Sequence, residues 1–286
     1  METKCTLCPN VCGIDRSKFI GACGVNNTVK IAKYYLHPFE EPPVSGSNGS
    51  GTVFFSGCAL KCVFCQNFEL SHKARGKDIT INELADIFKQ LEEKGAHNIN
   101  LVNPTHYWDK IIKALEIYKP NIPILANTHG YESLSTLKKI NDYIDVYLPD
   151  IKYFSSTLSK RYSGKENYFN VASTAIDFMI NNKPSIYQDG LIKQGVIVRH
   201  LVLPQATSDS KKILDWFAQY KDKSAISIMS QYTPFGELEN YPELNRKITA
   251  REYSTVIDYA LSLGIENMFV QEKKSADTKF IPDWDF

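Results

Sequence analysis

The sequence has no large excess of charge of either sign and no long apolar run. Its 33 basic and 32 acidic residues leave a net charge of +1, so no overall positive field favours nucleic acid as a partner. No segment approaches the roughly 20 apolar residues that span a bilayer, and the first residues, METKCTLCPN, lack a basic stretch followed by an apolar run. We therefore expect a cytoplasmic protein that acts on a small molecule or a protein, without nucleic acid or membrane contact.

Cysteine is absent after residue 65, although the sequence contains seven. They form two groups, namely Cys5, Cys8, Cys12 and Cys23, then Cys58, Cys62 and Cys65. A disulfide framework uses an even number of cysteines spread along the chain, whereas grouped thiols in a chain without an export signal favour metal binding. The sequence therefore predicts two metal centres.

The character of the sequence changes near residue 50. Residues 1–50 hold four cysteines and run into the Pro-, Gly- and Ser-rich stretch EEPPVSGSNGSG, so we expect a Cys-rich metal-binding segment followed by a linker. Residues 51–272 are expected to form the main domain, and residues 273–286 a C-terminal tail.

From residue 52 onward, short apolar runs alternate with helical patterns. The candidate strands are residues 52–57, 98–102, 123–128, 145–151, 195–204, 225–232 and 267–271. The clearest helix is capped by Thr80 or Asn82 and stopped by Gly95, and its apolar stripe consists of Leu84, Ile87, Phe88 and Leu91. Repeated strand–helix alternation implies a parallel sheet, so we expect an α/β barrel or partial barrel with its site at the carboxyl ends of the strands.

The loop after the first of these strands, GCALKCVFCQN, has the spacing C-x3-C-x2-C. Three thiolates on one short loop can ligate three irons of a cubane and leave the fourth iron open for a chelating substrate. A zinc site would need a fourth protein ligand, and His72 lies beyond the compact loop. We interpret Cys58, Cys62 and Cys65 as ligands of a [4Fe-4S] cluster, with structural zinc or merely buried thiols as the alternative.

The N-terminal cysteines have the spacing C-x2-C-x3-C-x10-C, which supplies four thiolates and closes a coordination sphere. Structural zinc fits because a short appendage has no other means of stabilisation. An auxiliary iron–sulfur cluster that relays electrons fits the same ligands. The spacing alone does not separate the two, and zinc is our first interpretation.

Motifs in order along nearly the whole chain carry a resemblance to a known family. They are CTLCPNVCGIDR, EEPPVSGSNGSGTVFFSGC, KCVFCQN, GAHNINLVNPTHY, YLPDIKY, VRHLVLP and SQYTP. In these the chain resembles radical S-adenosylmethionine (SAM) enzymes, and among them the PflX-type relatives of pyruvate formate-lyase activating enzyme. The resemblance implies α/β architecture, a partial (β/α)6 radical SAM barrel with a small N-terminal Cys-rich metal-binding appendage.

The resemblance also implies a reaction. SAM would bind the open iron of the [4Fe-4S] cluster, and flavodoxin or ferredoxin would supply one electron. The products would be methionine and a 5′-deoxyadenosyl radical that abstracts a substrate hydrogen. The protein would orient SAM and exclude water.

Two motifs indicate how SAM would be held. Asp150 and Lys152 match the Asp-x-Lys of the activating enzymes, whose lysine faces the SAM carboxylate. Asn103, Thr105 and His106 follow the second predicted strand, where relatives carry a Gly-Gly-Glu type turn that accepts the methionine amino group. Here the turn reads NPTHY, so these three residues are the candidates for that contact.

Further candidates for the cofactor or substrate pocket end other strands. They are Asn127, Thr128 and His129 on the third strand, and Gln231 and Tyr232 on the sixth. On the fifth strand only one of Arg199 and His200 should face the cavity, because alternate residues point inward, and we expect His200. A packing role is the alternative for each of these residues.

Three functions are open at this stage. An activating enzyme would abstract a hydrogen from a glycine of a glycyl-radical protein and predicts an open barrel mouth. A small-molecule enzyme, whose substrate radical fragments at a C–N or C–C bond, predicts an enclosed pocket with a few polar contacts. A non-enzymatic iron–sulfur or zinc electron-transfer protein would leave Asp150 and Lys152 without a task. Changed strand ends, with NPTHY where TPTHY is usual, favour the small molecule.

The leading specific hypothesis is a queuine lyase of bacterial deazapurine salvage, which splits the cyclopentenediol from the aminomethyl group. We expect Tyr107, Trp108 or Tyr131 to stack on the flat heterocycle and a carboxylate to face its amine. The tail adds candidates that fold over the barrel or pack on its flank, namely Asp277, Asp283, Trp284 and Asp285.

Overall fold

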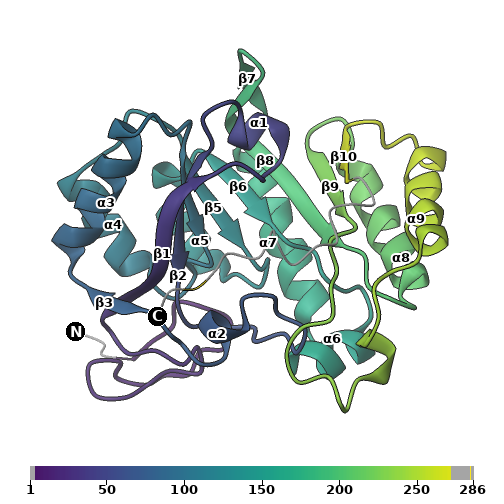
Figure 1. Ribbon diagram of the computed structural model, residues 1–286, viewed down its shortest axis with the longest axis horizontal. Helices are drawn as coiled ribbons and strands as arrows, with labels where there is room; N and C mark the ends of the chain where they lie inside the picture. The colour runs from purple at the N-terminus through teal and green to yellow at the C-terminus, as the bar shows by residue number, and fades with distance from the viewer. Residues whose placement is uncertain (1–3, 272–283, 285–286) are drawn as a thin grey trace.

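The computed structural model describes residues 4–271 and Trp284 (Figure 1). The strands are β1 (Val29–His37), β2 (Ser50–Phe55), β3 (Lys77–Ile79), β4 (Ile99–Val102), β5 (Ile124–Thr128), β6 (Val146–Pro149), β7 (Ile186–Gln188), β8 (Leu191–Leu201), β9 (Ala225–Met229) and β10 (Met268–Val270). The α-helices are α1 (Pro42–Ser45), α2 (Phe68–Ser71), α3 (Ile81–Glu93), α4 (Trp108–Ile117), α5 (Leu134–Ile140), α6 (Ser156–Ser163), α7 (Tyr168–Asn182), α8 (Thr207–Phe217) and α9 (Ala250–Ser262). Short 3-10 helices are η1 (Asn141–Tyr143), η2 (Ala218–Tyr220) and η3 (Pro242–Leu244).

The strands form one curved sheet in the order β10-β9-β8-β6-β5-β4-β2-β1-β3, with β7 paired to β8. Strands β2, β4, β5, β6, β8, β9 and β10 are parallel to their neighbours in this series. Strands β1 and β3 are antiparallel additions at one edge, and β7 pairs antiparallel with β8. Within residues 4–271 the sheet does not close, because β10 and β3 are its edges. The predicted partial α/β barrel is confirmed, and each of the seven predicted strands is present.

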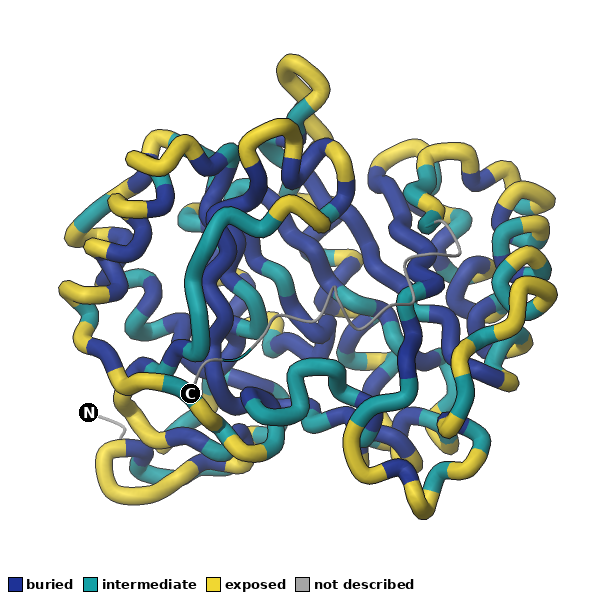
Figure 2. The backbone as a smooth tube through the Cα atoms, in the orientation of Figure 1, coloured by how far each residue is buried: buried dark blue, intermediate teal, exposed yellow. Residues whose placement is uncertain are grey.

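The parallel strands form because they are apolar on both faces. Every residue of β2, β6 and β9 is buried, as expected for strands covered by helices outside and by the barrel interior inside. Figure 2 shows these strands buried at the centre, with exposed residues on the surrounding helices and turns. In Figure 1, α3 and α4 flank one side of the sheet and α8 and α9 the other. The barrel therefore presents one set of strand ends to a common site.

Helix α3 begins and ends where its sequence predicts. Thr80 caps it and accepts a hydrogen bond from Glu83 N, and the Glu83 side chain bonds back to the cap in a capping box. The predicted apolar stripe is buried, and Gly95 follows the helix at φ +84°. No helix within the described part of the chain is long and apolar enough to cross a membrane.

The segment expected to be a linker belongs to the barrel. Strand β1 pairs antiparallel with β2, and the Pro-rich stretch after it forms helix α1 and carries the buried Glu41. Residues 29–37, which were expected within the Cys-rich segment and linker, therefore lie in the sheet because they pair with β2 and β3. Of the tail candidates, only Trp284 lies within the described residues; Asp277, Asp283 and Asp285 lie outside them.

Candidate active site

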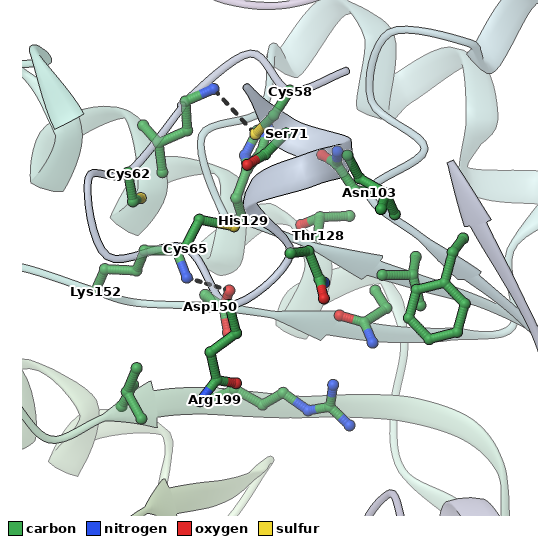
Figure 3. A pocket seen from close by; sticks show the side chains of 18 of the residues that line it. Cys58, Cys62, Cys65, Ser71, Asn103, Thr128, His129, Asp150, Lys152 and Arg199 are labelled. Atoms are coloured by element: carbon green, nitrogen blue, oxygen red, sulfur yellow. Dashed lines mark hydrogen bonds and ion pairs between the residues drawn. The ribbon is translucent and has the colours of Figure 1, made fainter. Parts of the chain in front are cut away.

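A cavity of about 270 Å³ lies at the carboxyl ends of the parallel strands. The predicted site residues that line it are Cys58, Cys62, Cys65, Asn103, Asn127, Thr128, His129, Asp150, Lys152 and Gln231. Figure 3 shows the three cysteines on one side of the cavity, Arg199 on the other, and Asp150 with Lys152 between them. The cavity therefore has a cysteine end and a far end.

The cysteine loop is held tightly at its start. Gly57 has φ +84°, and a Cβ there would lie 2.8 Å from Cys23 O, so only glycine fits. The Cys58 sulfur accepts hydrogen bonds from Leu60 N (3.4 Å) and Lys61 N (3.5 Å), and the Cys62 sulfur accepts one from Ser163 Oγ (3.2 Å). Donors around the sulfurs stabilise thiolates.

The donor set of this loop fits a three-thiolate cluster. Burial, with Cys65 and Cys62 nearby, raises the pKa of Cys58 to about 12. A metal that binds the sulfur takes the place of this proton. A cubane offers each of the three thiolates its own iron and leaves the fourth iron open. His72 stacks on Phe68 at 4.3 Å and does not line the cavity.

Asn103 is the member of NPTHY that faces the cavity. Its φ is +59°, and its Nδ2 donates to Gly57 O at 2.5 Å. Its Oδ1 is buried without a hydrogen-bond partner in the described chain, so it is an acceptor available to a ligand. Thr105 and His106 turn away, because Thr105 donates to Glu132 Oε1 (2.6 Å) and the His106 ring bonds Ser56 O (2.8 Å).

Asp150 and Lys152 form an ion pair beside the cysteines. Lys152 Nζ lies 2.5 Å from Asp150 Oδ2, with 16% and 20% of the two side chains exposed. Burial opposes the ammonium charge, but Asp150 and Cys62 outweigh it, so the pKa of Lys152 is raised and the side chain is charged. The pair places a fixed cation at the edge of the cavity.

The fifth parallel strand presents Arg199, not His200, to the cavity. Arg199 and Leu201, two residues apart on β8, both line the cavity. The His200 ring between them points away from it and bonds Ile151 O and Ser210 Oγ, both at 2.8 Å. The prediction that His200 faces the cavity is therefore wrong, and the residue that faces it is the preceding one, Arg199. Tyr232 also faces away, since its hydroxyl donates to Leu244 O at 2.7 Å.

The aromatic residues expected to stack on a substrate do not reach the cavity. Tyr107, Trp108 and Tyr131 are at most 3% exposed and do not line it. The aromatic lining comes instead from Phe54 and Phe55 of β2 and from Phe64 of the cysteine loop. Sequence reasoning also missed His37 and Glu40, which line the far end, because the stretch around them was interpreted as a linker. The adjacent acidic residues before Pro42 were the available signal.

The N-terminal cysteine segment packs directly on the cysteine loop. Cys58 N donates to Cys23 O at 2.9 Å, and Asn10 Nδ2 donates to Ala59 O at 2.8 Å. Arg16 is buried and donates to His106 O and Asn26 O, both at 2.5 Å. Any metal bound by the N-terminal cysteines would therefore adjoin the cluster loop.

A partial α/β barrel with three cysteines after its first parallel strand defines a class of cofactor-dependent barrel enzymes. The profile of the radical SAM superfamily matches residues 52–217, more than half of the chain. The chain belongs to the radical SAM superfamily and is a radical SAM enzyme, a class that uses SAM and a [4Fe-4S] cluster.

The chain is also similar to individual proteins. An uncharacterized protein of Methanocaldococcus jannaschii is 28% identical over 275 residues, covering 93% of this chain and 76% of that protein. The crystal structure of Streptococcus suis SuiB matches with a TM-score of 0.53 and 17% identity, over 76% of this chain and 47% of SuiB. The matched part is thus about half of SuiB, and the likeness concerns the fold alone.

Proposed function

We propose that this radical SAM enzyme acts on a small molecule and that the reaction is C–N fragmentation of queuine. The observation that carries the proposal is the far end of the cavity, which is lined by charged side chains withdrawn from solvent. Glu40 and Arg199 are 11% and 8% exposed there. A few buried polar groups at the end of a cavity are typical of small-molecule recognition. Activation of a glycyl-radical protein requires an open mouth but no such recognition end.

Within this proposal Cys58, Cys62 and Cys65 hold the cluster. The bound cluster and SAM would supply the hydrogen-abstracting radical after one-electron reduction, with flavodoxin or ferredoxin as the reductant. Asn103 Oδ1 would accept a hydrogen bond from the SAM amino group, and Lys152 would pair with the carboxylate. The remaining lining residues, including Asn127 and Gln231, would position the adenosine part and keep water out. Thr105, His106 and His200 do not line the cavity. They would support the residues that bind SAM without contacting SAM themselves.

We also propose that Cys5, Cys8, Cys12 and Cys23 hold a metal, with structural zinc first and a relay cluster second. Their segment bonds to the cluster loop, which supports either role. Metal analysis of the pure protein with Cys8→Ala as the variant separates them. Loss of zinc with lower thermal stability supports structure, whereas loss of iron and of turnover in a stable protein supports a relay.

Turnover tests the proposed reaction. Reconstituted protein is incubated without oxygen with SAM, dithionite and queuine, and 5′-deoxyadenosine and the aminomethyl deazapurine are quantified. We expect both to form together and to depend on queuine. Formation of 5′-deoxyadenosine without cleavage of queuine, or only with an added glycyl-radical protein, contradicts the proposal.

A further inference from the structure

The far end of the cavity is built from three distant parts of the chain. His37 and Glu40 come from the end of β1 and the turn after it, Phe54 from β2, and Arg199 from β8. All four side chains line the same cavity as the cysteine loop. A molecule that fills this end would therefore extend from the place where SAM is expected to bind.

Two carboxylates share one guanidinium at this end. Arg199 Nη2 donates to Glu40 Oε2 at 2.6 Å and also to Glu41 Oε2, and Arg199 Nε donates to Glu41 Oε1 at 3.0 Å. Burial opposes the charge of Arg199, but Glu41 and Glu40 outweigh it and raise its pKa, so the guanidinium is charged. Among the described residues of this cluster, two carboxylates face one guanidinium, which leaves one negative charge in excess. A charge buried in this way is stabilised by a cation.

Only one of the two carboxylates meets the cavity. Glu41 is packed behind Arg199 and does not line it, whereas Glu40 does. Glu40 is held in place, because Asn100 Nδ2 donates to its Oε1 at 2.7 Å. Asn100 is fully buried, and its Oδ1 has no hydrogen-bond partner in the described chain. Within the part of the chain that the structure describes, hydrogen-bond acceptors around Glu40 thus exceed donors.

Aromatic rings stand beside this carboxylate. Phe54 stacks on Tyr35 (centroids 5.9 Å apart, 14° between planes) and meets the edges of His37 (6.4 Å) and Trp284 (5.3 Å). Burial lowers the pKa of His37, with Glu40 opposing, so its ring is neutral at pH 7 and does not repel a cation. A fixed aromatic wall beside a carboxylate attracts a flat group that carries an ammonium.

We infer that Glu40 is the carboxylate that recognises the substrate, and that the substrate presents a protonated amine attached to a flat group. This inference rests on the proposed small-molecule function and names the class of ligand that its cavity selects. An anionic substrate would have to displace Glu40 or Glu41 from Arg199 and would meet the surplus negative charge. A neutral substrate would leave that charge without a partner.

Binding without turnover tests the inference. Queuine, with its secondary ammonium, is compared with queuine acetylated at that nitrogen, by calorimetry on reconstituted protein with SAM and no reductant. We expect the wild type to bind queuine about tenfold or more tightly than the acetylated form, as one charge-assisted hydrogen bond provides. In Glu40→Gln that preference should fall to about twofold or less.

Two further variants make the test specific. Glu41→Gln also removes the surplus charge, but it leaves the Glu40 oxygens in the cavity, so the preference for the amine should fall less than in Glu40→Gln. Glu40→Asp keeps the charge and should retain the preference for the amine. It is the second variant to measure where Glu40→Gln does not fold. Equal loss in Glu40→Gln and Glu41→Gln, or an undiminished preference in Glu40→Gln, overturns the inference.

The same samples separate this inference from the proposed reaction. If the wild type binds queuine with the Glu40-dependent preference but does not fragment it under reduction, the proposed reaction fails and the recognition stands. If the wild type fragments queuine and Glu40→Gln keeps the preference, the recognition fails alone. If the wild type binds neither compound, both fail.

Discussion

At the scale of single residues, the ion pair of Lys152 with Asp150 is the feature that the proposed function assigns most directly to SAM binding. Its ammonium is charged and lies at the edge of the cavity. Replacing Lys152 by Met should weaken SAM binding about tenfold or more, because one charge-assisted hydrogen bond to the carboxylate is lost. Equilibrium dialysis with labelled SAM on reconstituted protein measures this effect.

The matched control for that variant is Lys160→Met. Lys160 also pairs with a carboxylate, Glu166 at 3.0 Å, but it is 66% exposed and lies outside the cavity. Its SAM affinity should equal that of the wild type. Equal affinities of Lys152→Met and the wild type would show that the lysine does not hold SAM.

A second residue prediction concerns the buried Glu132. Burial raises its pKa from 4.5 to about 8, against the hydrogen bonds of Thr105 and Thr128. Above about pH 4.5 the unfolded chain loses this proton, whereas the folded chain keeps it up to about pH 8. The contribution of Glu132 to the free energy of unfolding is therefore complete below about pH 4.5 and is lost as the pH rises through about 8. Glu132→Gln has no proton to lose, and its thermal midpoint should fall less than that of the wild type between pH 6 and pH 9. Parallel curves for the two proteins would exclude the ionisation of Glu132 as the cause.

Single residues also show where sequence reasoning stops. The cysteine triplet and Lys152 were predictable because short spacing places them on one loop or strand end. The choice between Arg199 and His200 failed because the inward face of a strand depends on its register, which one sequence does not fix. Glu40 was missed because it reaches the cavity only through the pairing of β1 with β2.

At the scale of elements, helix α3 was predicted almost to its ends because its local signals agree. The capping box at Thr80 offers a direct test. Thr80→Ala should lower the free energy of unfolding by about 1 kcal/mol, since an N-cap bond to Glu83 N is lost. Asn82→Ala, two residues on, changes an alternative cap that the helix does not use and should cost less. Denaturant titration of both variants measures the difference, and a larger loss in Asn82→Ala would contradict the assigned cap.

Strand β1 is one of three strands, with β3 and β7, that the sequence did not predict. Its alternation of Val29 and Ile31 with lysines is short, and the Pro- and Gly-rich stretch after it is typical of a loop. Long-range pairing with β2 decides its structure, and such pairing is not written in local propensity. This strand matters because it brings His37 and Glu40 to the cavity.

At the scale of the whole molecule, the barrel assembles one site from residues spread between positions 37 and 231. Its topology was predictable because seven apolar runs alternate with helical patterns, and parallel crossovers follow from that order. The shape and charge of the cavity were not, because they depend on which side chains meet across the sheet. The role of Glu40 is therefore argued from the structure, whereas the cluster and the queuine hypothesis come mainly from the sequence.

The most direct test of the account is the electron paramagnetic resonance spectrum of the reduced, reconstituted protein before and after addition of SAM. The wild type should give an iron–sulfur signal that shifts when SAM binds the open iron. The shift should persist in Cys8→Ala and disappear in Cys62→Ala. A signal that SAM leaves unchanged, or a shift retained in Cys62→Ala, would contradict the claim that Cys58, Cys62 and Cys65 hold the cluster to which SAM binds.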